Sequence, residues 1–195
     1  HKARFAAGSD AYRFKETKAA KGRSKGGGAV FYRRNLGVDT KDIPIDEWQS
    51  HRFVSTYLHR PPTLDEYGED MIKMCVYWGA MMDPENNIDF IEEYFVKRGY
   101  EGFLYYHVDL NTGKKLPKAG EYTHENVKEG IFKEWEIYLR KHIGREQHRR
   151  ILQQCLEIED DMGPFDLFVA GGRCLRLVWR ENQVDQRLQE RWSVH

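Results

Sequence analysis

Three acidic residues stand out because each lies beside or within an apolar run, where a carboxylate is unfavourable. Asp10 follows a run of small and apolar residues, Glu85 comes soon after a second short apolar stretch, and Asp166 interrupts the segment PFDLFVA. A carboxylate buried there needs a metal ion, a cation or hydrogen-bond donors. Considered singly, Asp10 also fits a turn or helix cap, and Asp166 fits a first-turn residue favoured by the helix dipole. Both alternatives stay open on these segments alone.

If the three carboxylates converge, they predict a metal site. Hard oxygen ligands suit Mg²⁺ or Mn²⁺ and not zinc. Two such ions about 4 Å apart can activate a water and stabilise the leaving oxygen of a phosphodiester. Asp83 is an alternative to Glu85, or a fourth ligand; Glu85 is preferred because it precedes an Asn pair. Asp160 and Asp161 are interpreted as part of a solvated loop, with an outer-shell role at the metal site as the alternative.

The elements that must position these acids follow from the hydrophobic periodicity. We expect strands within 4–12 and at 29–34, 52–58, 80–82 and 103–108, and helices at 64–79, 88–98, 125–142, 145–159 and 165–179. This order indicates the α/β class, with one mixed sheet and helices on its faces. In the strand order 3-2-1-4-5, the first and fourth strands are neighbours, so Asp10 and Glu85 approach each other and the last helix brings Asp166 to the same edge. Residues 1–180 are expected to form one domain, and 181–195 a polar, frayed tail.

Composition excludes several classes of protein. Of 195 residues, 40% are hydrophobic and 13% aromatic, which excludes a disordered chain, while 31 basic residues balance 31 acidic ones and leave nucleic-acid binding undecided. No run approaches the roughly 20 apolar residues of a membrane span. No Walker A loop occurs. The chain begins inside a strand-like segment, so we expect a domain of a longer protein. Three cysteines without a CxxC pair are interpreted as reduced core residues of a cytosolic protein: Cys75, Cys155 and Cys174.

A Gly- and Lys-rich loop follows the first strand. It is either a solvated linker or a loop that contacts phosphates. A second long loop, at 109–124, could add Lys114, Lys115 and Lys118, and His107 before it is interpreted as a structural histidine. The basic residues of the first loop are Lys15, Lys18, Lys21, Arg23 and Lys25.

Several segments together resemble a known family. These are AGSDAYRF, then MDPENN before a helix that ends in KRGY, then YTHENVKEGIFKEWEIYL and FDLFVAGGRCL. Their order and spacing are similar to the nuclease domain of tailed-phage terminase large subunits, in the RNase H-like (retroviral integrase) superfamily. The sequence differs from the family pattern at Ala11, where Pro is usual, and at Phe165, where His or Asp is common.

The resemblance implies a five-stranded RNase H-like sheet and a metal-dependent endonuclease that cuts concatemeric double-stranded phage DNA. It assigns Asp10, Glu85 (with Asn87) and Asp166 as catalytic ligands of two Mg²⁺ or Mn²⁺ ions. The implied partners are the terminase ATPase domain, which this chain lacks, the small terminase subunit and the portal, in the host cytoplasm and without a membrane. Two alternatives remain: a Holliday-junction or RNA–DNA hybrid nuclease of the same fold, and a non-catalytic module that docks on DNA or the portal.

Overall fold

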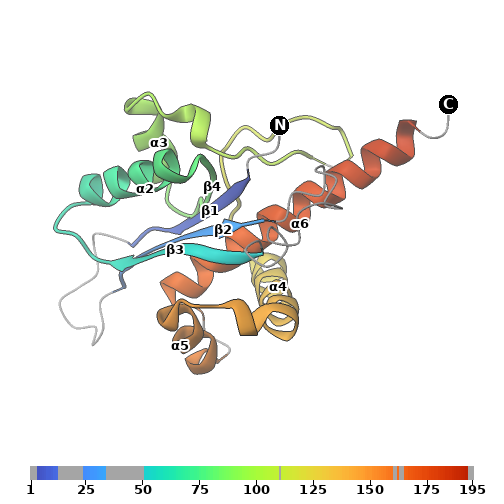
Figure 1. Cartoon of the computed structure of the whole chain (residues 1–195). Coiled ribbons are helices and arrows are strands. Elements are labelled where there is room, and N and C mark those ends of the chain that lie inside the picture. Colours follow the sequence, from blue (N-terminus) through green and yellow to red (C-terminus); the bar gives the residue numbers. More distant parts are fainter. Residues whose placement is uncertain are drawn as a thin grey trace.

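The computed structural model describes residues 4–12, 24–33, 51–109, 111–159, 162 and 165–192. Within them lies a mixed sheet with helices on both faces (Figure 1). The strands are β1 (Phe5–Asp10), β2 (Gly26–Tyr32), β3 (Arg52–His59) and β4 (Ala80–Pro84). The helices are α2 (Leu64–Trp78), α3 (Phe90–Lys97), α4 (Glu125–His142), α5 (Arg149–Glu157) and α6 (Asp166–Trp192), with short 3₁₀ turns η2 (Glu101–Phe103) and η3 (Ile143–Arg145).

The strand order is β3-β2-β1-β4. β1 pairs antiparallel with β2, which pairs antiparallel with β3, whereas β1 and β4 run parallel. The expected neighbourhood of the first and fourth strands is therefore confirmed, as is the α/β class. β3 is an edge strand, so one side of its backbone has no partner strand within this sheet.

The predicted fifth strand at 103–108 is wrong for the described chain, which has four strands in the sheet. Only Leu104 bridges to β4, opposite Met82, and the backbone then turns to a different partner. The carbonyl groups of Tyr105 and His107 accept hydrogen bonds from residues 120 and 116 of the following loop. Since these backbone groups are satisfied locally, they do not extend the ladder along β4. Farther along, Glu121 takes the place beside the end of β4 through a bridge to Glu85.

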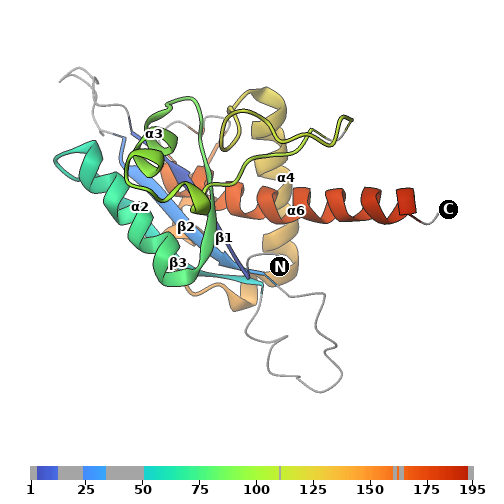
Figure 2. The same cartoon turned by 90° about the horizontal axis from the view of Figure 1, so that it is seen from above.

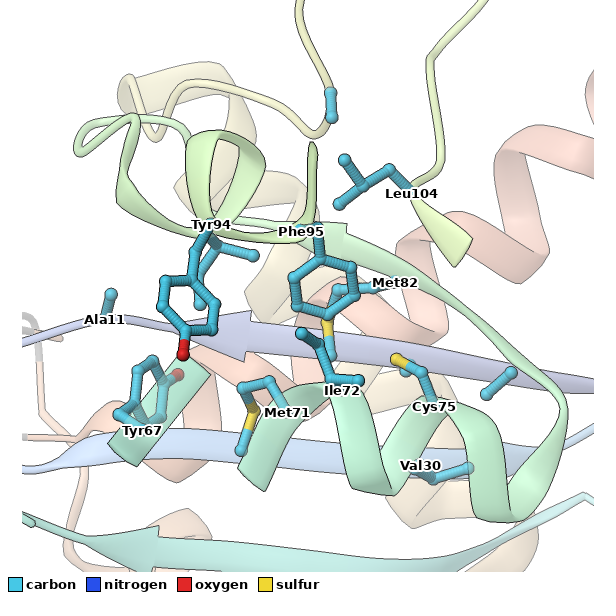
Figure 3. Close-up of a cluster of buried hydrophobic side chains, with 14 of the residues drawn as sticks. Ala11, Val30, Tyr67, Met71, Ile72, Cys75, Met82, Tyr94, Phe95 and Leu104 are labelled. Atoms are coloured by element: carbon cyan, nitrogen blue, oxygen red, sulfur yellow. The ribbon is translucent and has the colours of Figure 1, made fainter. Parts of the chain in front are cut away.

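Two hydrophobic cores lie on opposite faces of the sheet. α2 and α3 cover one face, and α4, α5 and α6 cover the other, in both views (Figures 1 and 2). Figure 3 shows the first core, in which Ile72 of α2 lies near Phe95 of α3 and Tyr67 of α2 lies near Tyr94. In the second core, Trp135 of α4 packs against residues of β3 and α6. Both faces of β1 and β2 are thus buried, which explains their apolar sequence.

The glycines at the start of β2 serve close packing. Residues 26–28 belong to the strand, although we expected them in a flexible loop that ended at residue 28. A Cβ at Gly27 would lie 2.1 Å from the carbonyl oxygen of Asp166, so the backbone of α6 rests directly on the strand. Gly8 of β1 is equally close to α6, because a Cβ there would lie 2.2 Å from the carbonyl oxygen of Ala170.

The ends of α2 and α3 follow local capping rules. Thr63 caps α2 by accepting from the backbone N–H of Glu66, in a capping-box pattern. Gly99 has φ 79° directly after α3, as is common for a glycine that ends a helix. Asp89 takes the N-cap position of α3, without a side-chain cap hydrogen bond. The partners of Asn87 lie at the candidate site.

The last two helices differ from the predictions in their bounds. α5 covers a shorter range than the predicted 145–159, and its Leu156 is 88% exposed. The buried polar residue of α5 is Gln154, which accepts from the backbone N–H of Phe168 at the start of α6. Trp179 of α6 is 41% exposed. The backbone of α6 stays helical to Trp192, through most of the segment expected to fray.

The cysteine interpretation agrees with the structure. Cys75 and Cys174 are buried, Cys155 is half-buried, and all three are free thiols. Burial raises the pKa of Cys75 to about 12, so this thiol stays protonated at neutral pH. None of the helices in the described ranges is both long enough and apolar enough to cross a membrane.

Candidate active site

Asp10 and Glu85 meet where two parallel strands end. The pairing of Ser9 with Pro84 continues beyond β4, because the backbone N–H of Glu85 donates to the carbonyl oxygen of Ser9 over 2.9 Å. Residues in register on parallel strands place their side chains on the same face. Glu85 lies close enough to Asp10 to raise the pKa of its carboxyl. The parallel β1–β4 pairing therefore creates the contact between the two acids.

The environment of Asp10 favours its protonated form. Burial raises the pKa of its carboxyl well above the ordinary value, the charge and hydrogen bond of Glu85 raise it further, and the charge of Asp166 adds to this. The guanidinium of Arg173 acts in the opposite direction. The negative charges of Glu85 and Asp166 beside a buried carboxyl therefore make ionisation of Asp10 unfavourable.

Asp166 is the first residue of α6 and is almost fully buried. Its Oδ1 accepts from the hydroxyl of Ser24 over 2.7 Å, and its Oδ2 accepts from the backbone N–H of Lys25 over 3.0 Å. The side chain thereby ties the start of β2 to α6, and it lies near enough to Asp10 to raise the pKa of that group. The three predicted acids are thus neighbours on the α6 side of the sheet.

Arg173 was not singled out from the sequence, yet it lies at the centre of this cluster. It is 1% exposed and comes seven residues after Asp166, which puts both on one face of α6. Its Nη2 lies 3.9 Å from Oε1 of Glu85, and its Nη1 donates to the carbonyl oxygen of Pro84 over 3.3 Å. Nη2 also donates to the hydroxyl of Thr123. The sequence signal was the same as for Asp166: a charged residue inside an apolar helix face.

Asp83, the alternative second ligand, is committed elsewhere. Its Oδ1 lies 2.8 Å from Nε2 of His107, and each side chain is 1% exposed. Burial alone would raise the pKa of Asp83, but His107 and, more weakly, Arg173 and Arg180 lower it below the ordinary value. Asp83 therefore holds His107 in the core, which agrees with the interpretation of His107 as a structural histidine. Of the two alternatives, Glu85 is the acid that contacts Asp10.

Asn87 orients Glu85. Its side-chain nitrogen donates to Oε1 of Glu85 over 2.9 Å, and its side-chain oxygen accepts from the backbone N–H of Thr123 over 3.0 Å. Because Thr123 also accepts from Arg173, the loop before α4 joins the end of β4 to α6. The Glu-x-Asn pattern therefore has a positioning role in this fold.

The structure describes only some of the basic residues that were predicted to contact DNA. Lys15, Lys18, Lys21 and Arg23 lie outside the described residues, as do Asp160 and Asp161. Lys25 is exposed, and its backbone donates to Asp166. In the second loop, Lys118 pairs with Asp89 over 2.9 Å at the surface, and Lys114 and Lys115 are exposed.

The side chains fit a divalent cation in part. In the ranges that the structure describes, no group of three or more His, Cys, Asp or Glu side chains converges closely enough to hold a metal ion. Asp10 and Glu85 nonetheless form a close carboxyl pair whose mutual repulsion a cation would relieve, and their oxygens are the ligands that Mg²⁺ and Mn²⁺ prefer. Asp166 would have to exchange a bond to Ser24 or Lys25 for one to the ion.

Comparison with known proteins adds no identification. No family model matches the sequence, and no curated protein matches it significantly.

Proposed function

We propose that this chain is a metal-dependent endonuclease domain that hydrolyses the phosphodiester backbone of double-stranded DNA. The observation that carries the proposal is the contact between Asp10 at the end of β1 and Glu85 just after β4, with Asp166 beside them. Three segments that are far apart in sequence contribute one acid each to a single edge. A purely structural role would not require two carboxyl groups to lie side by side at a partly exposed strand end, where each disfavours ionisation of its neighbour.

In this proposal Asp10 and Glu85 hold the cation, and Asp166 completes its ligands. A divalent ion bound there would activate a water and stabilise the leaving oxygen of the phosphodiester. The other residues have positioning roles. Asn87 orients Glu85, Arg173 balances the negative charge of the acids, and Ser24 fixes Asp166.

The resemblance to terminase nuclease domains supports a more specific proposal. The chain would belong to a phage packaging motor in the host cytoplasm and would cut concatemeric DNA, with the ATPase domain, the small terminase subunit and the portal as partners. The strand order β3-β2-β1-β4 is compatible with an RNase H-like sheet that lacks its last strand. A Holliday-junction or hybrid nuclease would use the same acids, and comparing cleavage of plain duplex, four-way junction and RNA–DNA hybrid separates them.

One observation favours a second candidate, a DNA- or portal-docking module without catalysis. Arg173 already supplies a positive charge beside Glu85, and the described acids do not form a three-ligand group. A site neutralised by its own arginine has no need of a metal. Calorimetric titration with Mn²⁺ distinguishes the two candidates: the nuclease binds the ion through Asp10 and Glu85, and the docking module binds none.

The direct test is plasmid nicking and linearisation in Mn²⁺, Mg²⁺ and EDTA. Asp10→Asn, Glu85→Gln and Asp166→Asn should each lower the rate by more than about a hundredfold, since loss of even an outer-shell partner of a metal costs about 10- to 100-fold. Glu136→Gln is the control, because Glu136 is an exposed acid on α4 that pairs with Arg140. Cleavage that survives all three substitutions, or that continues in EDTA, would refute the proposal.

A further inference from the structure

A polar cleft lies between the edge strand β3 and helix α5. Its volume is about 680 Å³, within the range of ligand-binding clefts. Lys25, just before β2, lines it together with His59 at the end of β3 and Arg150 at the start of α5. These three side chains are exposed, so the cleft opens to solvent.

The charge of the cleft is positive. Among the residues that the structure describes, neither Lys25 nor Arg150 forms an ion pair, so both cations are open to a ligand. The carboxylate in the lining, Glu157, accepts from the side-chain nitrogen of Gln153 over 2.8 Å. An open cleft with two cations, a histidine and an amide donor suits an extended polyanion better than a buried apolar ligand.

The cleft shares a wall with the acidic cluster. Lys25, whose side chain lines the cleft, donates its backbone N–H to Asp166. Gln154, on the α5 side of the cleft, accepts from the backbone N–H of Phe168 in the first turn of α6. Two lining residues of the cleft, Lys25 and Gln154, therefore bond directly to the first turn of α6, where Asp166 lies.

We infer that this cleft binds the phosphodiester backbone of one DNA strand and guides the strand toward Asp10 and Glu85. The inference rests on the proposed nuclease function and deepens it, because it assigns a substrate-binding surface to Arg150, His59 and Gln153, which the sequence did not single out. Arg150 and Lys25 contact phosphates, and Gln153 donates to them. Such contacts fix the register of the strand without reading bases, as a sequence-nonspecific enzyme requires.

The chain offers a matched control, since Arg149 and Arg150 are adjacent, exposed arginines at the start of α5 and only Arg150 lines the cleft. Fluorescence anisotropy with a labelled DNA duplex and a labelled single strand, in EDTA to prevent cleavage, measures binding by the full chain. Arg150→Glu should weaken binding about tenfold, and Arg150→Gln should lower the salt slope of log K by about one. Arg149→Glu should change binding less than about twofold.

Equal effects of Arg149→Glu and Arg150→Glu would overturn the inference, because they would reflect net charge and not the cleft. So would an unchanged affinity in a correctly folded Arg150→Glu, with folding checked by circular dichroism. The outcome is separable from that of the proposed function. Binding that depends on Arg150 but never leads to cleavage supports the cleft and refutes the nuclease; cleavage at an unchanged KM in Arg150→Glu refutes the cleft alone.

Discussion

Nε2 of His107 lies 2.8 Å from Oδ1 of Asp83, and both side chains are buried. Because this pair occupies Asp83, Glu85 is left as the acid that contacts Asp10. The pair thus identifies Asp83 as a structural carboxylate, whereas Glu85, two residues later, is the candidate catalytic one. The contact also fastens the segment that contains His107 to the end of β4.

Removing one partner of the buried pair should destabilise the protein strongly. Asp83→Asn and His107→Ala should each lower the free energy of unfolding by about 3–5 kcal/mol, because the other group stays buried without its partner. Urea denaturation measures the change. Glu136→Gln, which breaks an exposed pair with Arg140, should cost less than about 1 kcal/mol. If breaking either pair lowered the free energy of unfolding by a similar amount, burial would not explain the importance of the Asp83–His107 pair.

The same pair predicts part of the acid sensitivity. Since the folded pKa of Asp83 lies below its unfolded value, its stabilising contribution is present above the unfolded pKa and is lost as pH falls through the folded pKa. Asp83→Asn should therefore show a shallower loss of stability in acid than the parent protein.

Asp10 should have the opposite pH dependence. Its pKa is raised by burial and, next, by Glu85, so the folded state binds the proton more tightly than the unfolded chain does. The free energy of unfolding should fall as pH rises from the unfolded pKa, about 4, through the folded pKa, and should stay low above it. Asp10→Asn removes this loss and should stabilise the protein by about 1 kcal/mol at neutral pH. A variant less stable than the parent at neutral pH would contradict the assignment.

Divalent ions should stabilise the parent protein in thermal unfolding. An ion that binds only the folded state adds about 2.7 kcal/mol at one hundred times its Kd. Mn²⁺ should therefore raise the Tm of the parent and of Glu136→Gln, but not that of Asp10→Asn or Glu85→Gln. An equal rise in all four would place the ion at a different site. This measurement does not depend on cleavage.

Arg173 should be coupled to Asp10. Arg173→Met leaves the acids without their buried positive charge and should destabilise the protein by about 3 kcal/mol or more. Adding Asp10→Asn removes part of the uncompensated charge, so the double variant should recover part of this loss at neutral pH. A double-mutant cycle measured by urea denaturation gives the coupling energy, which should exceed about 0.5 kcal/mol. Strict additivity would show that Arg173 acts through packing alone.

Gly27 should not tolerate a side chain. A methyl group there would lie 2.1 Å from the carbonyl oxygen of Asp166, so Gly27→Ala must push α6 away from β2. We expect a cost of about 1–3 kcal/mol and, because Asp166 moves with the helix, weaker binding of Mn²⁺. Gly102→Ala is the control, since its Cβ would meet no atom within 4 Å. Comparable losses in both variants would point to backbone entropy instead.

The sequence by itself determined the elements whose signals are local. The capping box at Thr63, the glycine after α3 and the periodic apolar face of α4 each depend on residues within a few positions, and the structure agrees with them. The misplaced carboxylates at Asp10 and Asp166 were also visible, because a charge inside an apolar run is evident without a fold. The hydrogen-bond partners of polar side chains could not be predicted from the sequence. Asn87 donates to Glu85, and Gln154 accepts from the backbone of α6.

Only the tertiary structure decided what depends on distant partners. The fifth strand was lost because the loop at 116–120 competes for its backbone groups, and such competition leaves no periodic trace in the sequence. By sequence alone, the glycines before residue 29 resemble a flexible loop. In the structure, the backbone of α6 packs directly against Gly27. The choice between Asp83 and Glu85 required His107, and the charge balance of the acids required Arg173. Hydrogen bonds and burial act over a few ångströms in space, whereas the partners can be far apart in sequence: 24 residues for Asp83 and His107, and 89 for Pro84 and Arg173.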